Sequence, residues 1–266
     1  MIFALWCLSL ALDQNSFLHP WIQKRRGAAL LMPFLLAASP SALSDYRFSP
    51  CDGEHQAVDV TLQRIENEWP MRGSGDAVSQ YVQKLGVRLA HFSVYGRNIS
   101  WRFSVVRNLA PNAFSIGGGY VFITDGAVNF VQNESELAAI LAHELGHELA
   151  GHFCGAPDLS DSGGLFDIFS APKTQQHQVG VGSMTLAIDP VKEQQADQIA
   201  ISILQAGGFD PRAMLNVARR LPSGGIAHLM DANRIQSLER TIANLPPITA
   251  GSSEDFLKLK RSLAAQ

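Results

Sequence analysis

Two segments in the first half of the chain repeat apolar residues every three or four positions, which is the spacing of an amphipathic helix. They run over 58–69 and 76–92. The residues between them, 70–75, include proline, serine and two glycines, which are typical of turns. The pattern therefore predicts two helices joined by a short connection.

Three shorter segments that follow are typical of strands. Residues 101–107 alternate in polarity, whereas 114–116 and 120–124 are rich in aromatic and β-branched side chains. Three consecutive glycines, 117–119, separate the last two segments, and the pair at 125–126, Asp-Gly, predicts a turn. We expect these strands to form a small antiparallel sheet.

The second half of the chain returns to helical spacing. Residues 135–153 form an apolar-periodic stretch, and Asn133 with Glu136 forms a capping box at its start. Further helices are predicted from Glu193, from Pro211, over 235–245 and over 254–263. A long connection, 155–189, precedes the Glu193 helix. The sequence thus predicts a mostly helical α+β domain, with the small sheet beside the 135–153 helix.

That helix contains His143, Glu144 and His147 in the sequence HELGH. Residues four apart share one face of a helix, so both imidazoles can bind one metal ion. Glu144 is offset by about 100° and reaches a water on that ion. Two histidine ligands beside a carboxylate base are the arrangement of a zinc hydrolase. His152 would lie on the opposite side of a continuous helix, so we expect it outside the site.

A catalytic zinc usually has three protein ligands and one position open to water. Glu193 and Asp197 lie in the downstream sequence EQQAD and share one helix face. One carboxylate can bind the metal while the other accepts the free ring N–H of a ligand histidine. An acidic pair on such a helix is often simply solvated. The upstream HExxH motif favours the metal interpretation here.

HELGH followed by EQQAD resembles the HtpX-like and CAAX-prenyl-protease-like gluzincin metallopeptidases, whose pattern is HExxH followed by ExxAD or ExEAD. Residues 112–126, NAFSIGGGYVFITDG, resemble the family segment before the metal helix, and His228 with Arg234 resembles its HP…R element. The resemblance covers roughly residues 75–240. It implies one zinc ion per chain, with His143, His147 and Glu193 as ligands. Asp197 is then the residue that orients a ligand histidine.

The expected reaction is cleavage of peptide bonds, with Glu144 as the general base. Two roles stay open for His228: it donates a hydrogen bond to the oxyanion, or its neutral nitrogen fills the fourth zinc position and keeps the enzyme latent. Leu229 and Met230 stand where the family usually has prolines. The strand 120–124 is expected to present an edge onto which an extended substrate adds.

Backbone pairing of that kind suits unfolded or misfolded cell-envelope proteins, the substrate class that the resemblance also implies. The main alternative is a chaperone-like zinc-binding module with little turnover. Glu144 argues against that alternative, because a pure binding protein needs no base. A zinc hydrolase acting on a non-peptide substrate also stays open.

Composition and charge also indicate the partners and the cellular location to expect. The 266 residues carry a net charge of −3, and the one basic cluster, Lys24-Arg25-Arg26, gives no reason to expect nucleic acid as a partner. That cluster precedes an apolar run, 27–38, and the small residues 42–44, which together predict an export signal cleaved after Ser44. Residues 1–44 are then the export segment, and 45–266 form one zinc metallopeptidase domain in the periplasm. The alternative is a two-part membrane anchor that includes the apolar run 2–12.

Cleavage after Ser44 would leave two of the three cysteines, Cys51 and Cys154. An exported protein can keep a disulfide between them, but the sequence does not show whether their Cα atoms approach. Two unrelated thiols are the alternative. The sequence also leaves open the oligomeric state and any membrane-associated partner.

Overall fold

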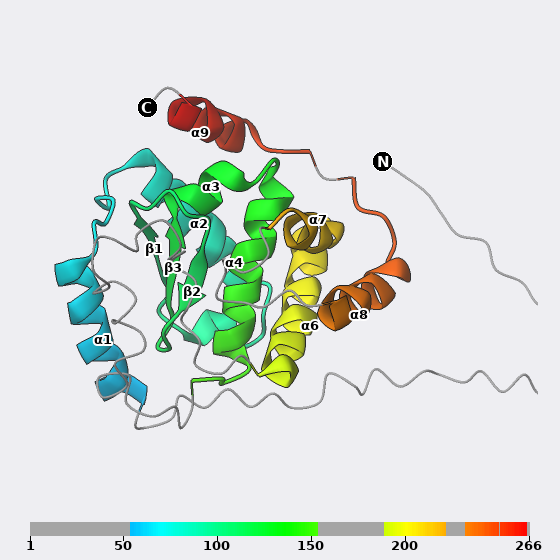
Figure 1. Ribbon diagram of the computed structural model, residues 1–266, viewed down its shortest axis with the longest axis horizontal. Helices are drawn as coiled ribbons and strands as arrows, with labels where there is room; N and C mark the ends of the chain where they lie inside the picture. Colours follow the sequence, from blue (N-terminus) through cyan, green and yellow to red (C-terminus); the bar gives the residue numbers. More distant parts are fainter. Residues whose placement is uncertain (1–53, 154–188, 222–231, 250, 265–266) are drawn as a thin grey trace, which may run out of the picture. The chain divides into compact units, whose positions relative to one another are not determined.

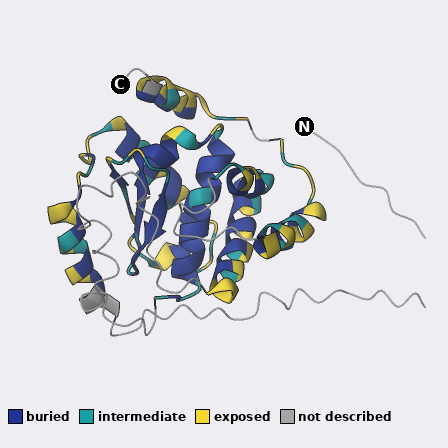
Figure 2. Cartoon of the chain, in the orientation of Figure 1, coloured by how far each residue is buried: buried dark blue, intermediate teal, exposed yellow. Residues whose placement is uncertain are grey.

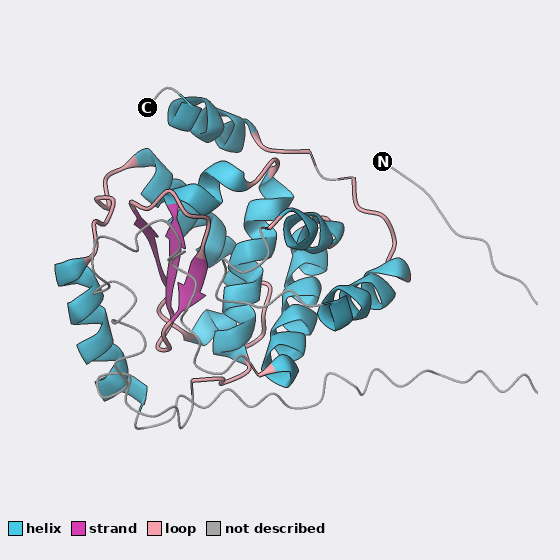
Figure 3. Cartoon of the chain, in the orientation of Figure 1, coloured by secondary structure: helices cyan, strands magenta, loops and turns pink. Residues whose placement is uncertain are grey.

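The elements of the computed structural model lie within the unit Asp45–Gln266, and the residues it describes are 54–153, 189–221, 232–249 and 251–264. The helices are α1 (Glu54–Glu68), α2 (Ala77–Ala90), α3 (Asp125–Phe130), α4 (Glu134–Leu149), α6 (Pro190–Gly207), α7 (Arg212–Arg220), α8 (Ala232–Ala243) and α9 (Glu254–Ala264). The strands are β1 (Arg102–Val106), β2 (Ala113–Ser115) and β3 (Tyr120–Thr124), and a 3-10 turn, η1 (Gly96–Asn98), precedes β1. Figures 1 and 3 show a small sheet among helices, which confirms the mostly helical α+β fold.

The three strands form a mixed sheet in the order β1-β3-β2. β2 and β3 pair antiparallel, with Phe114 opposite Phe122, whereas β1 and β3 pair parallel, with Ser104 opposite Phe122. The expectation of a wholly antiparallel sheet is therefore wrong. The chain runs from β1 to the far edge of the sheet and returns through a hairpin, so the strand that fills the middle has the direction of β1.

The central place of β3 also corrects the expected substrate edge. Tyr120–Thr124 has a neighbouring strand on each side, so its backbone has no free edge. β1 and β2 are the outer strands, and Met71 bridges to Val106 beyond β1. β2 packs against α4. An extended peptide that adds to the sheet beside α4 would therefore add to β2.

The hairpin between β2 and β3 needs its three glycines. Gly117, Gly118 and Gly119 all have positive φ, between 62° and 94°, a region that other residues rarely adopt. The buried Glu148 carboxylate of α4 accepts hydrogen bonds from the backbone N–H groups of Gly117 at 2.9 Å and of Gly119 at 3.2 Å. The metal-motif helix thus fixes the turn that leads into the central strand.

Asp125 and Gly126, where the sequence predicts a turn, instead begin α3. The Thr124 hydroxyl accepts a hydrogen bond from the Ala127 N–H at 3.1 Å, which caps this short helix. A Cβ on Gly126 would lie 2.2 Å from the Leu109 carbonyl oxygen. Glycine is needed here because two backbone segments approach closely, and a local pattern does not distinguish that need from a turn.

α4 lies in the middle of the fold, between the sheet on one side and α6 on the other (Figure 1). Figure 2 shows it buried along nearly its whole length, and Leu137, Leu141 and Leu145 are fully buried. Its start is as predicted, since Asn133 accepts a hydrogen bond from the Glu136 N–H at 3.0 Å. A helix with core on both sides holds its side chains rigidly, which suits a metal site.

The other predicted helices are confirmed, with boundaries that differ by a few residues. The main difference is the end of α4, at Leu149 instead of residue 153. None of the helices described is long and apolar enough to cross a bilayer. The predicted export segment, the 155–189 connection, Cys51 and Cys154 lie outside the described residues.

Candidate metal centre

Three buried side chains converge between α4 and α6. The Nε2 atoms of His143 and His147 are 3.1 Å apart, and each lies 3.3 Å from a carboxylate oxygen of Glu193. Tetrahedral zinc with bonds of about 2.0–2.1 Å holds its ligand atoms about 3.3 Å apart. His143 contacts Oε2 of Glu193 and His147 contacts Oε1, so the contacts are close to the separations of zinc ligands, and the three residues together are a group that could hold a metal ion.

Asp197 is one turn further along α6 and contacts the other side of His143. Its Oδ1 lies 3.0 Å from His143 Nδ1, so the Nε2 of that ring is left to face His147 and Glu193. Burial opposes a proton on His143, but hydrogen bonds to Asp197 and Glu193 outweigh it and raise the His143 pKa. Protons therefore compete with a metal for this ring.

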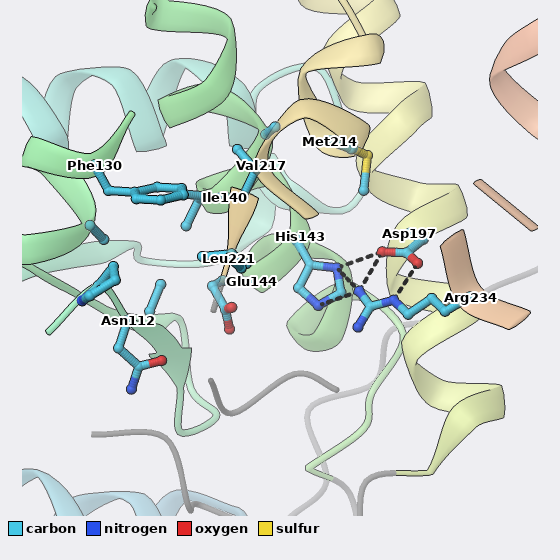
Figure 4. A pocket seen from close by; sticks show the side chains of 14 residues that line it. Asn112, Phe130, Ile140, His143, Glu144, Asp197, Met214, Val217, Leu221 and Arg234 are labelled. Carbon is cyan, nitrogen blue, oxygen red and sulfur yellow. Dashed lines mark hydrogen bonds and ion pairs between the residues drawn. The ribbon is translucent and has the colours of Figure 1, made fainter. Parts of the chain in front are cut away.

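Arg234 of α8 pairs with both carboxylates of α6, and Figure 4 shows its contact with Asp197. Its Nε and one terminal nitrogen donate to Asp197 at 2.8 and 2.7 Å, and the other terminal nitrogen donates to Glu193. Burial alone would raise the pKa of Asp197, but the hydrogen bonds from Arg234 and His143 lower it to about 2. Asp197 is therefore ionised at any ordinary pH.

Arg234 is the site residue whose role its place in the HP…R element did not predict. Its guanidinium is buried, and burial opposes its charge, yet the ion pairs with Asp197 and Glu193 leave its pKa raised. Two buried carboxylates on one helix face need a positive partner. That need is a signal in the sequence, but the sequence does not say which arginine meets it.

Glu144 lies next to the ligand atoms without joining them. It is buried, and its Oε2 accepts a hydrogen bond at 3.3 Å from the hydroxyl of Ser115, on β2. It also lines the same pocket as His143. A carboxylate beside the ligands, on the side of the edge strand, has the position that a general base needs.

His152 contacts a ligand histidine, so the prediction that it lies on the opposite side of the helix is wrong. Its Nδ1 lies 2.9 Å from the Nδ1 of His147. The expected position requires a helix that continues through residue 152. Instead α4 ends at Leu149, and Gly151, two residues later, has a positive φ of 67°. The N–H of His152 bonds to the His147 carbonyl and that of Gly151 to the Glu148 carbonyl, a Schellman ending that turns the chain back. Gly151 is the signal in the sequence for this ending.

A pocket opens beside the ligands, with Asp197 and Arg234 at one end of its lining. Figure 4 shows Phe130, Ile140 and Val217 grouped together, with His143 and Glu144 at the border of the group. The cavity measures about 70 Å³, several times the roughly 10–15 Å³ that one water needs by the same measure. It is large enough for a side chain, and its walls are mostly apolar: Ala113, Ala127, Phe130, Ala139, Ile140, Met214, Val217 and Leu221.

Of the residues predicted for the site, the structure brings together His143, Glu144, His147, Glu193 and Asp197. His228 lies outside the described residues, as do its neighbours at 222–231. The structure adds Arg234, Ser115 and His152 to the surroundings of the ligands.

Comparison with known proteins gives the same picture. Residues 76–242 match the model of peptidase family M48. Proteins named beta-barrel assembly-enhancing protease are 30% identical to this chain in Escherichia coli (strain K12), over 78% of this chain and 47% of that protein, and in Yersinia pestis, over 69% and 43%. The mitochondrial metalloendopeptidase OMA1 of Schizosaccharomyces pombe is 29% identical over 47% of this chain and 38% of that protein.

The chain spans about half the length, or less, of these curated relatives. The matched region nevertheless contains the HExxH motif of α4, the carboxylates of α6 and Arg234 of α8. More than half of the chain matches one family model, and the matched part holds the whole cluster of buried ligands. The chain therefore belongs to peptidase family M48.

Proposed function

We propose that this chain is a zinc-dependent endopeptidase that acts on unfolded or misfolded cell-envelope proteins. The observation that carries the proposal is the set of separations of 3.1 to 3.3 Å among His143, His147 and Glu193, with Glu144 beside them. Two imidazoles and one carboxylate are the ligand set of several catalytic zinc sites. When bound, zinc would supply a Lewis acid that polarises a peptide carbonyl and makes a water acidic.

Residues of the chain would carry out the proton transfer and hold the ligands in position. Glu144 accepts the proton from the attacking water and passes it to the leaving amine. Ser115 holds one oxygen of Glu144 at 3.3 Å, which limits the rotation of the carboxylate. Asp197 fixes the His143 ring by its contact at Nδ1, and Arg234 fixes Asp197. His228 remains a proposal as oxyanion donor or latency residue.

Substrate binding is supported by two features beside the ligands. β2 is an outer strand of the sheet and packs against α4, so an extended peptide added to it would pass the ligand cluster. The apolar pocket bordered by His143 and Glu144 would then take an apolar side chain next to the cleaved bond. Unfolded proteins expose both extended backbone and apolar side chains.

The proposed cellular location is the periplasm, as the predicted export segment implies. Relatives named beta-barrel assembly-enhancing protease and mitochondrial metalloendopeptidase support the proteolytic part of the proposal. Their substrates come to this chain only as part of the proposal, since the matched part of this chain covers less than half of each relative.

The test combines metal analysis with proteolysis. Residues 45–266 should contain about one zinc per chain and cleave an unfolded protein such as casein, and chelation should stop the cleavage. Glu144→Gln should reduce cleavage at least ~10²-fold, the low end for losing a general base, with zinc content unchanged. Full zinc content with no cleavage by the wild-type protein would instead support the binding-module alternative.

A further inference from the structure

Two hydrogen-bonding side chains, His152 and Gln195, form a row that begins at the Nδ1 side of the His147 ring. That Nδ1 lies 2.9 Å from His152 Nδ1, and His152 Nε2 lies 3.0 Å from Oε1 of Gln195. His152 belongs to the turn that ends α4, and Gln195 lies on α6 between Glu193 and Asp197. The row therefore links both helices that carry the ligand cluster.

The proton positions in this row are fixed by simple accounting. A ring nitrogen that binds a metal carries no proton, so with Nε2 facing the cluster the Nδ1 of His147 must carry one. Only an acceptor can face that N–H, so His152 Nδ1 must offer its lone pair. The proton of His152 then sits on Nε2, where the Gln195 carbonyl oxygen accepts it. Every polar atom in the row has a partner only when His147 donates to His152 and His152 donates to Gln195.

The surroundings of His152 favour the neutral ring that this arrangement needs. The side chain is buried, and a charged ring is disfavoured in a buried position. The Lys192 ammonium donates to the His152 backbone carbonyl at 3.1 Å. A ring with protons on both nitrogens would place one N–H against the N–H of His147.

The two ligand histidines are thus held in different ways. The Nδ1 of His143 contacts the carboxylate of Asp197, whereas the Nδ1 of His147 contacts the neutral Nδ1 of His152. The buried surroundings of the two rings already include three carboxylates, those of Glu144, Glu193 and Asp197. A neutral acceptor orients the second ring without adding a further negative charge there.

We propose that His152 is a positioning residue for His147, and that Gln195 fixes the tautomer in which His152 can do this. The proposal rests on the zinc site proposed above. It gives an essential function to a residue outside the HExxH and EQQAD motifs. Partners of this kind typically change metal affinity by about 10–100-fold when removed.

The test measures zinc affinity by competition with a chelating dye, in residues 45–266. His152→Phe keeps an aromatic ring but removes the acceptor, and should weaken zinc binding about 10–100-fold. His152→Asn restores an acceptor oxygen near the place of Nδ1, and should bind zinc within a few-fold of wild type. Gln195→Leu removes the acceptor for His152 Nε2 and should also weaken binding. Gln198→Leu, an exposed change on the same helix, is the control.

A second readout is the tautomer of His147 in the metal-free protein, observed by nitrogen NMR of the imidazole rings. The proton should sit on Nδ1 in wild type and be shared between both nitrogens in His152→Phe. Equal zinc affinity and an unchanged tautomer in His152→Phe would overturn the inference while leaving the zinc site intact. A wild-type protein that binds no zinc would overturn the proposed function itself. If His152→Phe does not fold, the comparison of Gln195→Leu with Gln198→Leu decides in the same way.

Discussion

Gly146 of α4 faces Ala196 of α6 so closely that a Cβ on Gly146 would lie 2.5 Å from the Ala196 carbonyl oxygen. The contact lies between the ligand histidines of one helix and the carboxylates of the other. The absence of a side chain at Gly146 therefore sets the distance across the metal cluster. This gives the fourth residue of HELGH a defined role.

Gly146→Ala should push α4 and α6 apart and disturb the ligand geometry. Overpacking of this kind costs about 1–3 kcal/mol, and we expect both a lower free energy of unfolding and at least a tenfold weaker zinc affinity. Denaturant unfolding and dye competition measure the two effects. Gly73→Ala is the control, because a Cβ there meets nothing within 4 Å. Wild-type zinc affinity in Gly146→Ala would contradict the role assigned to this contact.

Arg234 offers a second test, which separates fold from metal binding. Arg234→Met leaves Glu193 and Asp197 buried without their cation, and such a loss costs about 3–5 kcal/mol. The metal-free variant should therefore melt well below the wild-type protein. Bound zinc would supply positive charge beside the same carboxylates, so the rise in melting temperature on adding zinc should be larger in the variant.

Arg240→Met is the matched control, since Arg240 is an exposed arginine on the same helix. It should melt like wild type with and without zinc. Equal melting temperatures of metal-free Arg234→Met and wild type would show that the ion pairs of Arg234 contribute nothing to stability.

A feature of the metal centre could be predicted from the sequence when its residues lie close together along the chain. His143 and His147 share a helix face by their spacing alone, and the helix is where the sequence predicts it. The HExxH motif favours a metal role for the acidic pair, but choosing Glu193 over Asp197 as the ligand required the family resemblance. The Arg234 ion pairs and the parallel pairing of β1 with β3 depend on how distant segments meet. Periodicity along the chain carries no information on either.

His152 is a different case, because its signal is present in the sequence. Gly151 follows the last periodic residues of α4, and a glycine there typically ends a helix. Extending the helix to residue 153 places His152 on the wrong side. The error of four residues at a helix end, which is ordinary in itself, thus reverses a statement about the metal site.

Asp197 predicts a specific acid dependence of stability in the metal-free protein. Its pKa is about 2 in the fold, against a usual value of 3.8. A group with a lowered pKa stabilises the fold above its unfolded value, and this stability is lost as pH falls towards 2. One pKa unit corresponds to about 1.4 kcal/mol, so roughly 2 kcal/mol should disappear between about pH 4 and pH 2. Asp197→Asn should flatten that part of the curve, measured by urea unfolding at a series of pH values.

The control for this curve is Asp59→Asn, at an exposed position of α1. It should keep the wild-type slope between about pH 4 and pH 2. An Asp197→Asn protein with the wild-type slope would show that the acid dependence arises elsewhere in the chain.

The apolar pocket beside His143 predicts a preference among peptide substrates. Val217 of α7 is buried in its wall, so Val217→Phe should fill part of the cavity. Cleavage of peptides with leucine or phenylalanine beside the cleaved bond should fall by about 10–200-fold in kcat/KM, the range for a misfit of about 1–3 kcal/mol in an apolar pocket. Peptides with alanine at that place should lose much less. Val60→Phe, at an exposed position on α1, should leave both peptide classes unaffected. An equal loss for both peptide classes in Val217→Phe, with zinc content intact, would show that this pocket does not receive the substrate side chain.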